Sequence, residues 1–288
     1  MAAPDDFFTR ANALLDRIEQ LIPSEKPVLD TSNSVAFRWQ VRGLNKTLIP
    51  VKATSGIRLS DLQCIERQKQ EIDRNTRQFL QKLPANHVLL WGPRGTGKSS
   101  LIKSLLTEYS KKGLRLIEVE KQHLIDLPDI VEMLGDEKHR FIIFCDDLSF
   151  EANDPSYKAM KVVIDGSISN TPENILIYAT SNRRHLMPEY MSENLQSKMI
   201  DGELHLNETI EEKISLSERF GLWLAFHPFN QDEYLTIVDH WIKSLDAPVD
   251  DKETMHKAAL KWALEHGSRS GRSASQFARD WAGRMGLK

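Results

Sequence analysis

Apolar residues gather in five short, nearly continuous runs between residues 87 and 226, and segments with helical spacing lie between the runs. A run of this kind indicates a strand that is buried on both faces, as parallel strands are when crossover helices cover the sheet. The predicted strands are HVLLW (87–91), LRLIEV (114–119), RFIIFCD (140–146), NILIYAT (174–180) and LWLAF (222–226). The pattern therefore predicts an α/β fold.

The segments on either side of these runs have other patterns. Apolar residues at helical spacing over 5–22 predict an amphipathic helix that ends at Pro23. Alternation over 35–41 predicts a half-buried strand, and the charged stretch 60–83 predicts a further helix. From about residue 230 to the C-terminus the spacing is helical throughout. We therefore expect an N-terminal helix and strand extension (1–60), an α/β domain (61–228) and a small all-helical lid domain (229–288).

Composition narrows the class of protein. The 288 residues are 40% apolar and 27% charged, which is typical of a folded globular chain. The net charge of −3 argues against a generally basic nucleic-acid binder. Two cysteines are too few for a disulfide framework, and no apolar run approaches the roughly 20 residues of a membrane span. The chain also begins without a basic-then-apolar signal pattern, so we expect a cytoplasmic protein without a membrane partner.

The segment LLWGPRGTGKSSL lies between the first apolar run and a helical segment. It matches the P-loop pattern G-x-x-x-x-G-K-[ST] in full and in the right structural context. Glycines let backbone N–H groups form an anion nest, and the following helix N-terminus adds partial positive charge. A fortuitous glycine loop is the weaker interpretation. The predicted residues for binding nucleoside triphosphate are Gly92, Pro93, Arg94, Gly95, Thr96, Gly97, Lys98, Ser99 and Ser100.

Acidic residues end the third apolar run, in the sequence FIIFCDDLSFE. A carboxylate at the end of a strand beside a P-loop orients Mg²⁺, so Asp146 and the Ser99 hydroxyl are the predicted metal ligands. The residue that activates the attacking water is less well defined. Asp147 is the preferred general base because it directly follows Asp146, and Glu151 is the alternative.

Three further polar side chains complete the candidate site. Asn182, just after the fourth run, is predicted to position the attacking water. Arg219, just before the fifth run, is predicted to reach across a subunit boundary and stabilise charge on the transferred phosphoryl group. In the lid, Arg272 is predicted to contact the nucleotide, with Arg269 as the alternative.

The order of these motifs resembles that of the AAA+ ATPases. The likeness rests on the P-loop, on Asp146 and Asp147, on Asn182, on Arg219 in SERFG and on Arg272 in SGRSA. More closely, the P-loop region, FCDDLSFE and RSGRSASQFARDW resemble a family of bacterial AAA+ ATP-binding proteins of unknown function. The resemblance implies a five-stranded parallel sheet, ATP and Mg²⁺ between the sheet and the lid, and a homo-oligomer. The usual Glu is replaced by Asp147, and the segment EKQHLIDLPDI lacks the pore-loop pattern of polypeptide-threading unfoldases.

Two functions follow from these observations. The first is an AAA+ ATPase that couples hydrolysis to the remodelling or loading of an unknown protein or nucleic-acid partner. The second is an ATP-gated binding or switch protein with little turnover, which Asp147 in place of Glu favours. A P-loop kinase for a small molecule is a third class, but it does not explain Asn182, Arg219 and Arg272 together.

Overall fold

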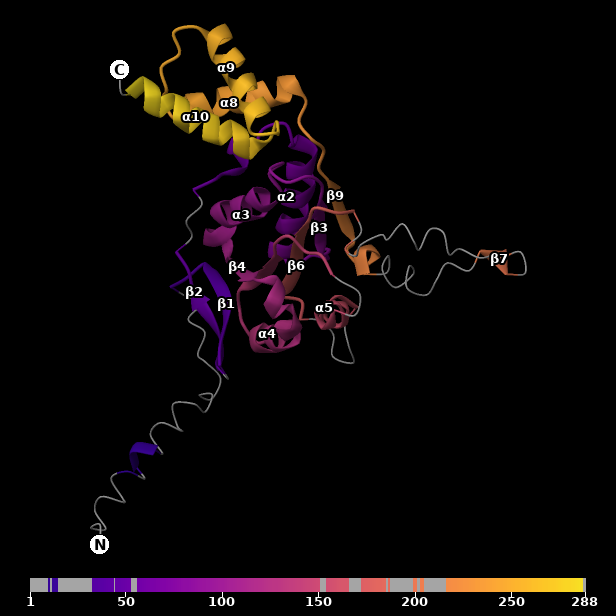
Figure 1. The fold of residues 1–288 in the computed structure, drawn as a ribbon. Helices are drawn as coiled ribbons and strands as arrows, with labels where there is room; N and C mark the ends of the chain where they lie inside the picture. Colours follow the sequence, from indigo (N-terminus) through magenta and orange to yellow (C-terminus); the bar gives the residue numbers. More distant parts are fainter. Residues whose placement is uncertain are drawn as a thin grey trace.

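The computed structural model describes residues 10, 12–14, 33–43, 45–52, 56–150, 154–165, 172–184, 186, 199–200, 203–204 and 216–286. Most of the helix predicted at 5–22, with Pro23, lies outside these residues. The described chain forms an α/β domain with a helical lid at one end (Figure 1).

The central sheet has seven strands in the order β2-β1-β4-β5-β6-β3-β9. The strands are β1 (Ala36–Arg42), β2 (Asn45–Pro50), β3 (Val88–Trp91), β4 (Leu114–Val119), β5 (Arg140–Cys145), β6 (Ile175–Ser181) and β9 (Leu222–Ala225). A separate antiparallel pair is formed by β7 (Met199–Ile200) and β8 (Glu203–Leu204). All neighbours in the central sheet pair in parallel except β1 and β2.

The expected five-stranded sheet was therefore too small. The five apolar runs do form adjacent parallel strands, but β1 adds a sixth strand by pairing in parallel with β4. The antiparallel edge strand β2 then adds a seventh. Its sequence NKTLIP carries too few apolar residues to be recognised as a strand from the pattern alone.

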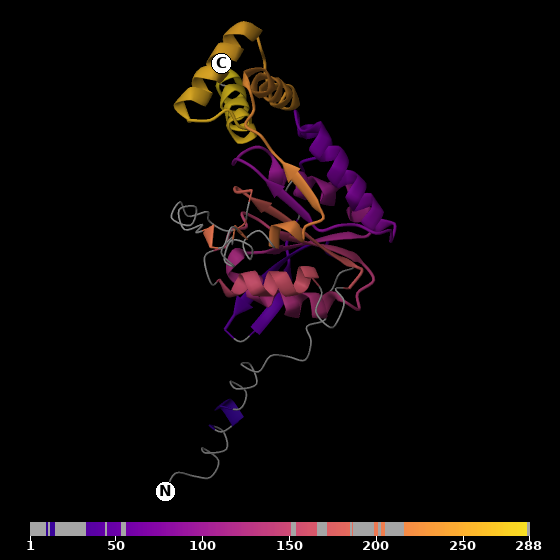
Figure 2. The ribbon, with the colours of Figure 1, turned by 90° about the vertical axis from the view of Figure 1, so that its right-hand side faces the viewer.

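Helices cover both faces of the sheet (Figures 1 and 2). The α-helices are α2 (Glu66–Leu80), α3 (Lys98–Tyr109), α4 (Leu127–Leu134), α5 (Pro155–Asp165), α8 (Gln231–Ser244), α9 (Lys252–Glu265) and α10 (Gly271–Gly286). Short 3-10 helices are η1 (Leu59–Asp61), η2 (Ser110–Lys112) and η3 (Lys121–Asp126). Among the described residues, no helix is long and apolar enough to cross a lipid bilayer.

Alternate strand residues point to opposite faces, so the sheet separates two hydrophobic cores. In β3, Val88 and Leu90 face the core that α2 and α3 cover, whereas Leu89 faces the core that α4 and α5 cover. The first core continues into the lid, where Tyr234 and Phe277 are buried. The lid is therefore packed on the α/β domain through a continuous apolar contact.

Clear helix caps fix the lid helices. The side chain of Asn230 accepts a hydrogen bond from the backbone N–H of Glu233 at the start of α8, and the Glu233 carboxylate accepts one from the backbone N–H of Asn230. At the start of α9 the carboxylate of Asp251 accepts from two backbone N–H groups. Such caps satisfy donors that the first helical turn leaves unpaired.

A buried carboxylate joins the N-terminal strand pair to the rest of the domain. Asp126 accepts hydrogen bonds from the Trp39 indole at 3.0 Å and from the Lys46 ammonium at 2.6 Å. Burial alone would raise the pKa of Asp126, but these two donors outweigh it and lower the pKa. The strand pair is thus held to η3 by a charged hydrogen-bond network.

The side chain of His87 is partly buried just before β3. Its Nδ1 atom accepts a hydrogen bond from the backbone N–H of Ile177 at 3.0 Å. Burial lowers the pKa of His87 to about 4, so the imidazole is neutral at physiological pH.

Candidate functional site

A cavity of about 930 Å³ lies between the carboxyl ends of the parallel strands and the lid. Its floor is the P-loop with the ends of β5 and β6, and its roof is formed by α8 and α10. Residues 56–65, which precede α2, contribute a side wall. Ligands of open α/β sheets bind at this edge, outside the carboxyl ends of the strands.

The P-loop follows β3 and leads into α3, which begins at Lys98. Gly92 donates its backbone N–H to Ser181 at 3.1 Å, and a Cβ at this position would lie 2.2 Å from the Phe226 carbonyl oxygen. Gly95 has a φ of +79°, and a Cβ there would lie 2.7 Å from the Cβ of Ser270. The loop therefore requires glycine where it touches β9 and where it touches the lid.

The Lys98 side chain is buried and folds back over the loop. Its ammonium donates to the carbonyl oxygens of Gly92 at 2.6 Å and Pro93 at 2.7 Å, and lies 3.4 Å from Asn182 Oδ1. Burial lowers the pKa of Lys98, and the nearby charges of Asp146 and Asp147 oppose this shift. The ammonium is thus positioned among polar groups at the centre of the cavity floor.

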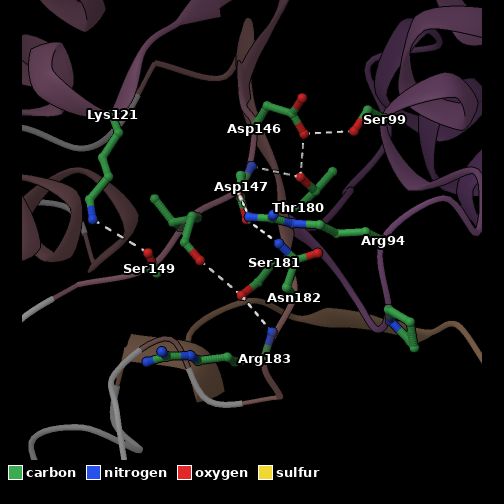
Figure 3. Close-up of polar contacts among 12 residues, drawn as sticks. Arg94, Ser99, Lys121, Asp146, Asp147, Ser149, Thr180, Ser181, Asn182 and Arg183 are labelled. Atoms are coloured by element: carbon green, nitrogen blue, oxygen red, sulfur yellow. Dashed lines mark hydrogen bonds and ion pairs between the residues drawn. The ribbon is translucent and has the colours of Figure 1, made fainter. Parts of the chain in front are cut away.

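Asp146 and Ser99 meet at the end of β5 (Figure 3). The Ser99 hydroxyl donates to Asp146 Oδ1 at 2.6 Å, and the Thr180 hydroxyl donates to the same oxygen at 2.5 Å. Hydroxyl and carboxylate oxygens suit Mg²⁺, which typically takes one or two protein ligands and completes its shell with phosphate oxygens and water. The residues present therefore fit this ion. Thr180 was not selected from sequence, although its place at the polar end of a buried strand was a usable signal.

Asp147 has an unusual backbone conformation, with a φ of +52°. Its backbone N–H donates to the Thr180 hydroxyl at 2.9 Å, which holds the turn against β6. One carboxylate oxygen accepts from Arg94 at 3.0 Å, and the other accepts from the Asn182 amide (Figure 3). The structure thus brings Asp147 and Asn182 together above the P-loop. Glu151, the alternative base, lies outside the described residues.

The start of α10 contacts the P-loop directly. The backbone N–H of Gly271 donates to the Gly95 carbonyl at 2.8 Å. Arg272, Gln276 and Arg279 follow along the helix and line the cavity, whereas Arg269 does not. Within the described part of the chain, Arg272 and Arg279 make no ion pair or hydrogen bond. The lid therefore presents guanidinium groups to the cavity, which suits an anionic ligand.

The rest of the cavity wall combines apolar side chains with polar ones such as Asp61 and Gln63. The apolar lining side chains come from the segment before α2 and from the lid: Ile57, Leu62, Ile65, Phe229, Ile237 and Trp241. Ligand pockets commonly combine such an apolar part with a few polar groups that fix orientation. This part of the cavity suits a planar base, and sequence reasoning missed all of its residues because no motif marks them.

Arg219 lies apart from these residues. Its guanidinium forms an ion pair with Asp165 at the end of α5, and it is not among the residues that line the cavity of its own chain. The role of Arg219 across a subunit boundary stays a prediction.

Comparison with solved structures identifies the fold. The Thermotoga maritima RuvB Holliday junction branch migration motor matches with a TM-score of 0.53 and 16% identity over 79% of this chain. A variant of the same RuvB reaches 0.55 at 15% identity. The FIGL-1 AAA domain in complex with ADP matches with a TM-score of 0.50 and 17% identity, and covers 80% of this chain.

These likenesses confirm an AAA+ type α/β fold. The chain spans about 65% of the length of the RuvB chains. The comparison with curated proteins finds no match.

A family profile matches almost the whole chain. The matched segment is 32–285, and the family is described as "Protein of unknown function (DUF815)". The expected resemblance to a family of uncharacterised proteins is thereby confirmed, and the likeness to AAA+ proteins holds at the level of the fold. The chain belongs to the DUF815 family.

Proposed function

We propose that this protein is an AAA+ ATPase that binds ATP with Mg²⁺ between its α/β domain and its lid. The observation that carries the proposal is the convergence of Lys98, the Ser99–Asp146 pair and Arg272 on one cavity beneath α10. A cation, a pair of oxygen ligands and a lid guanidinium suit the phosphates of a nucleoside triphosphate. The apolar wall suits its base.

Each side chain has a defined role in this proposal. The P-loop N–H groups and Lys98 bind the phosphates, and Ser99 and Asp146 would hold Mg²⁺. When bound, the ion neutralises charge on the phosphate oxygens. Asn182 orients a water molecule, and Asp147 accepts its proton as the water oxygen bonds to the γ-phosphorus. The bond from that phosphorus to the bridging oxygen breaks, which leaves ADP and phosphate.

The subunit arrangement is also part of the proposal. We infer a homo-oligomer in which Arg219 of one subunit exchanges Asp165 for the γ-phosphate bound by its neighbour. Arg272 would report the state of the nucleotide to the lid. The cycle would remodel or load a protein or nucleic-acid partner. Cys64 and Cys145 are both free, which supports a reducing compartment such as the cytoplasm.

One observation favours the alternative of an ATP-gated switch with little turnover. Both carboxylate oxygens of Asp147 accept hydrogen bonds from protein donors, namely Arg94 and Asn182. A water molecule that Asp147 is to deprotonate has to compete with these two donors, by exchange with one of them or by sharing its oxygen. Slow hydrolysis would follow if that exchange is rare.

The test is phosphate release from ATP at several protein concentrations, with Lys98→Ala and Arg219→Ala beside the wild type. We expect specific activity that rises with concentration and is lost in Lys98→Ala, together with at least about tenfold weaker nucleotide binding. Arg219→Ala should bind ATP normally but lose the part of the specific activity that depends on protein concentration. Binding without turnover at every concentration supports the switch, and wild-type affinity in Lys98→Ala contradicts the nucleotide site.

A further inference from the structure

Arg94 extends from the P-loop across the cavity floor to Asp147. Its Nη2 atom donates to Asp147 Oδ2 at 3.0 Å (Figure 3). Asp147 Oδ1 accepts from Asn182 Nδ2, and Asn182 Oδ1 lies 3.4 Å from the Lys98 ammonium. These four side chains form a continuous network above the loop that would hold the phosphates.

Arg94 would have two anions to choose from, the Asp147 carboxylate and a phosphate held by the loop. Its present partner is a carboxylate, and the loop that carries it is the predicted phosphate cradle. Arginine binds phosphate through charge-assisted, often bidentate hydrogen bonds, which are stronger than an ion pair in water. A γ-phosphate bound by the loop would therefore compete with Asp147 for the guanidinium.

The ion pair is exposed enough to exchange readily. The Arg94 side chain is 76% exposed and that of Asp147 is 55% exposed. Pairs between exposed side chains contribute little to stability, because water screens them and both side chains lose rotational freedom. The Asn182 contact does not depend on Arg94, so Asp147 would remain anchored after the exchange.

We propose that Arg94 is a positioning residue that senses the γ-phosphate and controls Asp147. Without triphosphate it holds the carboxylate. When ATP binds, Arg94 moves to the γ-phosphate, and the freed oxygen of Asp147 accepts a hydrogen bond from the attacking water. This inference rests on the proposed function and adds to it a residue that couples nucleotide identity to the base.

The test compares Arg94→Ala and Arg94→Lys with wild type in binding of ADP and of a non-hydrolysable ATP analogue, and in turnover. Arg74→Ala is the matched control, because Arg74 is also exposed and paired with a carboxylate, Glu71, but lies on α2 outside the cavity. Arg94→Ala should weaken binding of the ATP analogue by about tenfold or more, which is the effect of losing one charge-assisted hydrogen bond. ADP affinity should stay within about twofold. The kcat should fall, and Arg94→Lys should recover part of the loss.

A second measurement tests whether Arg94 acts through Asp147. Asp147→Asn removes the competing anion and should strengthen binding of the ATP analogue. The gain should be clearly smaller in an Arg94→Ala background, since the two residues are coupled. If Asp147→Asn raises the affinity for the ATP analogue equally in both backgrounds, the proposed exchange is wrong. It is also wrong if Arg94→Ala loses affinity for ADP and for the analogue equally, or if this variant keeps wild-type turnover. A wild-type protein that binds neither nucleotide would instead refute the proposed function itself.

Discussion

Gly95 provides the sharpest test of how the lid and the P-loop fit together. A Cβ at this position would meet Ser270 Cβ at 2.7 Å and Oγ at 2.9 Å, and the φ of +79° disfavours any L side chain. Gly113 has a similar φ of +92° but nothing within 4 Å of its ideal Cβ. Gly95→Ala and Gly113→Ala therefore share a backbone cost and differ in the clash.

The magnitudes follow from these two contributions. A left-handed backbone costs an alanine about 1–2 kcal/mol, which is the expected loss of stability in Gly113→Ala. Gly95→Ala adds an overpacking cost of about 1–3 kcal/mol, and it displaces the Gly271 N–H that donates to the Gly95 carbonyl. We therefore expect Gly95→Ala to be less stable than Gly113→Ala and to bind nucleotide more weakly, because the lid can no longer close on the loop.

Urea unfolding and titration with a fluorescent nucleotide measure the two effects. Ser270→Gly removes both atoms that clash and by itself should cost only about a few tenths of a kcal/mol in helix capping. The double variant Gly95→Ala with Ser270→Gly should therefore recover most of the lost affinity. Equal behaviour of the Gly95 and Gly113 variants, or no recovery in the double variant, would refute this account of the contact.

Two predictions concern stability and pH. Asp126→Asn should lower the free energy of unfolding by about 1–3 kcal/mol at pH 7, because the buried Trp39 indole and the exposed Lys46 ammonium lose a charged acceptor. The lowered pKa of Asp126 places this stabilisation above about pH 4 and removes it as pH falls further, so urea unfolding at pH 3 should show a smaller difference between variant and wild type. If the free energies of unfolding of variant and wild type differ equally at pH 7 and pH 3, the stabilisation does not come from the ionised Asp126 carboxylate. For His87, with a pKa of about 4 in the folded state, wild-type stability should fall between about pH 6.5 and 4 by up to about 3 kcal/mol, since the unfolded chain takes up the proton first. His87→Asn retains an acceptor for Ile177 and should lack this part of the slope in the same assay; an unchanged slope would show that another group is responsible.

The five strands β3, β4, β5, β6 and β9 were predictable to within one or two residues because each is a short, nearly continuous apolar run. The place of β1 was not predictable, since its parallel pairing joins Ala36 to Leu116 across a long stretch of chain. Nothing local in either segment specifies that partner. The strand itself was recognised, but its addition to the main sheet required the tertiary structure.

In the candidate site, too, some features are marked by local motifs, whereas others arise only from the tertiary structure. Lys98, Ser99 and Asp146 were found because local motifs mark them, and the structure brings them together. The contact between Arg94 and Asp147 joins two motifs that are far apart in the chain, and no spacing rule reports it. The apolar wall has no motif because many combinations of apolar side chains can line such a pocket.

The lid is attached to the P-loop at both ends of the loop's glycine-rich turn. β9 ends at Ala225, Phe226 packs against Gly92, and α8 begins at Gln231. On the other side, α10 is bonded to Gly95. In mechanical terms the lid resembles a lever whose short arm ends at these two contacts with the P-loop and whose long arm runs along α8. Since α8 has 14 residues and is about 21 Å long, a large displacement of its far end reaches the loop as a small one. A partner that pushes on the outer end of the lid would therefore change the conformation of the P-loop.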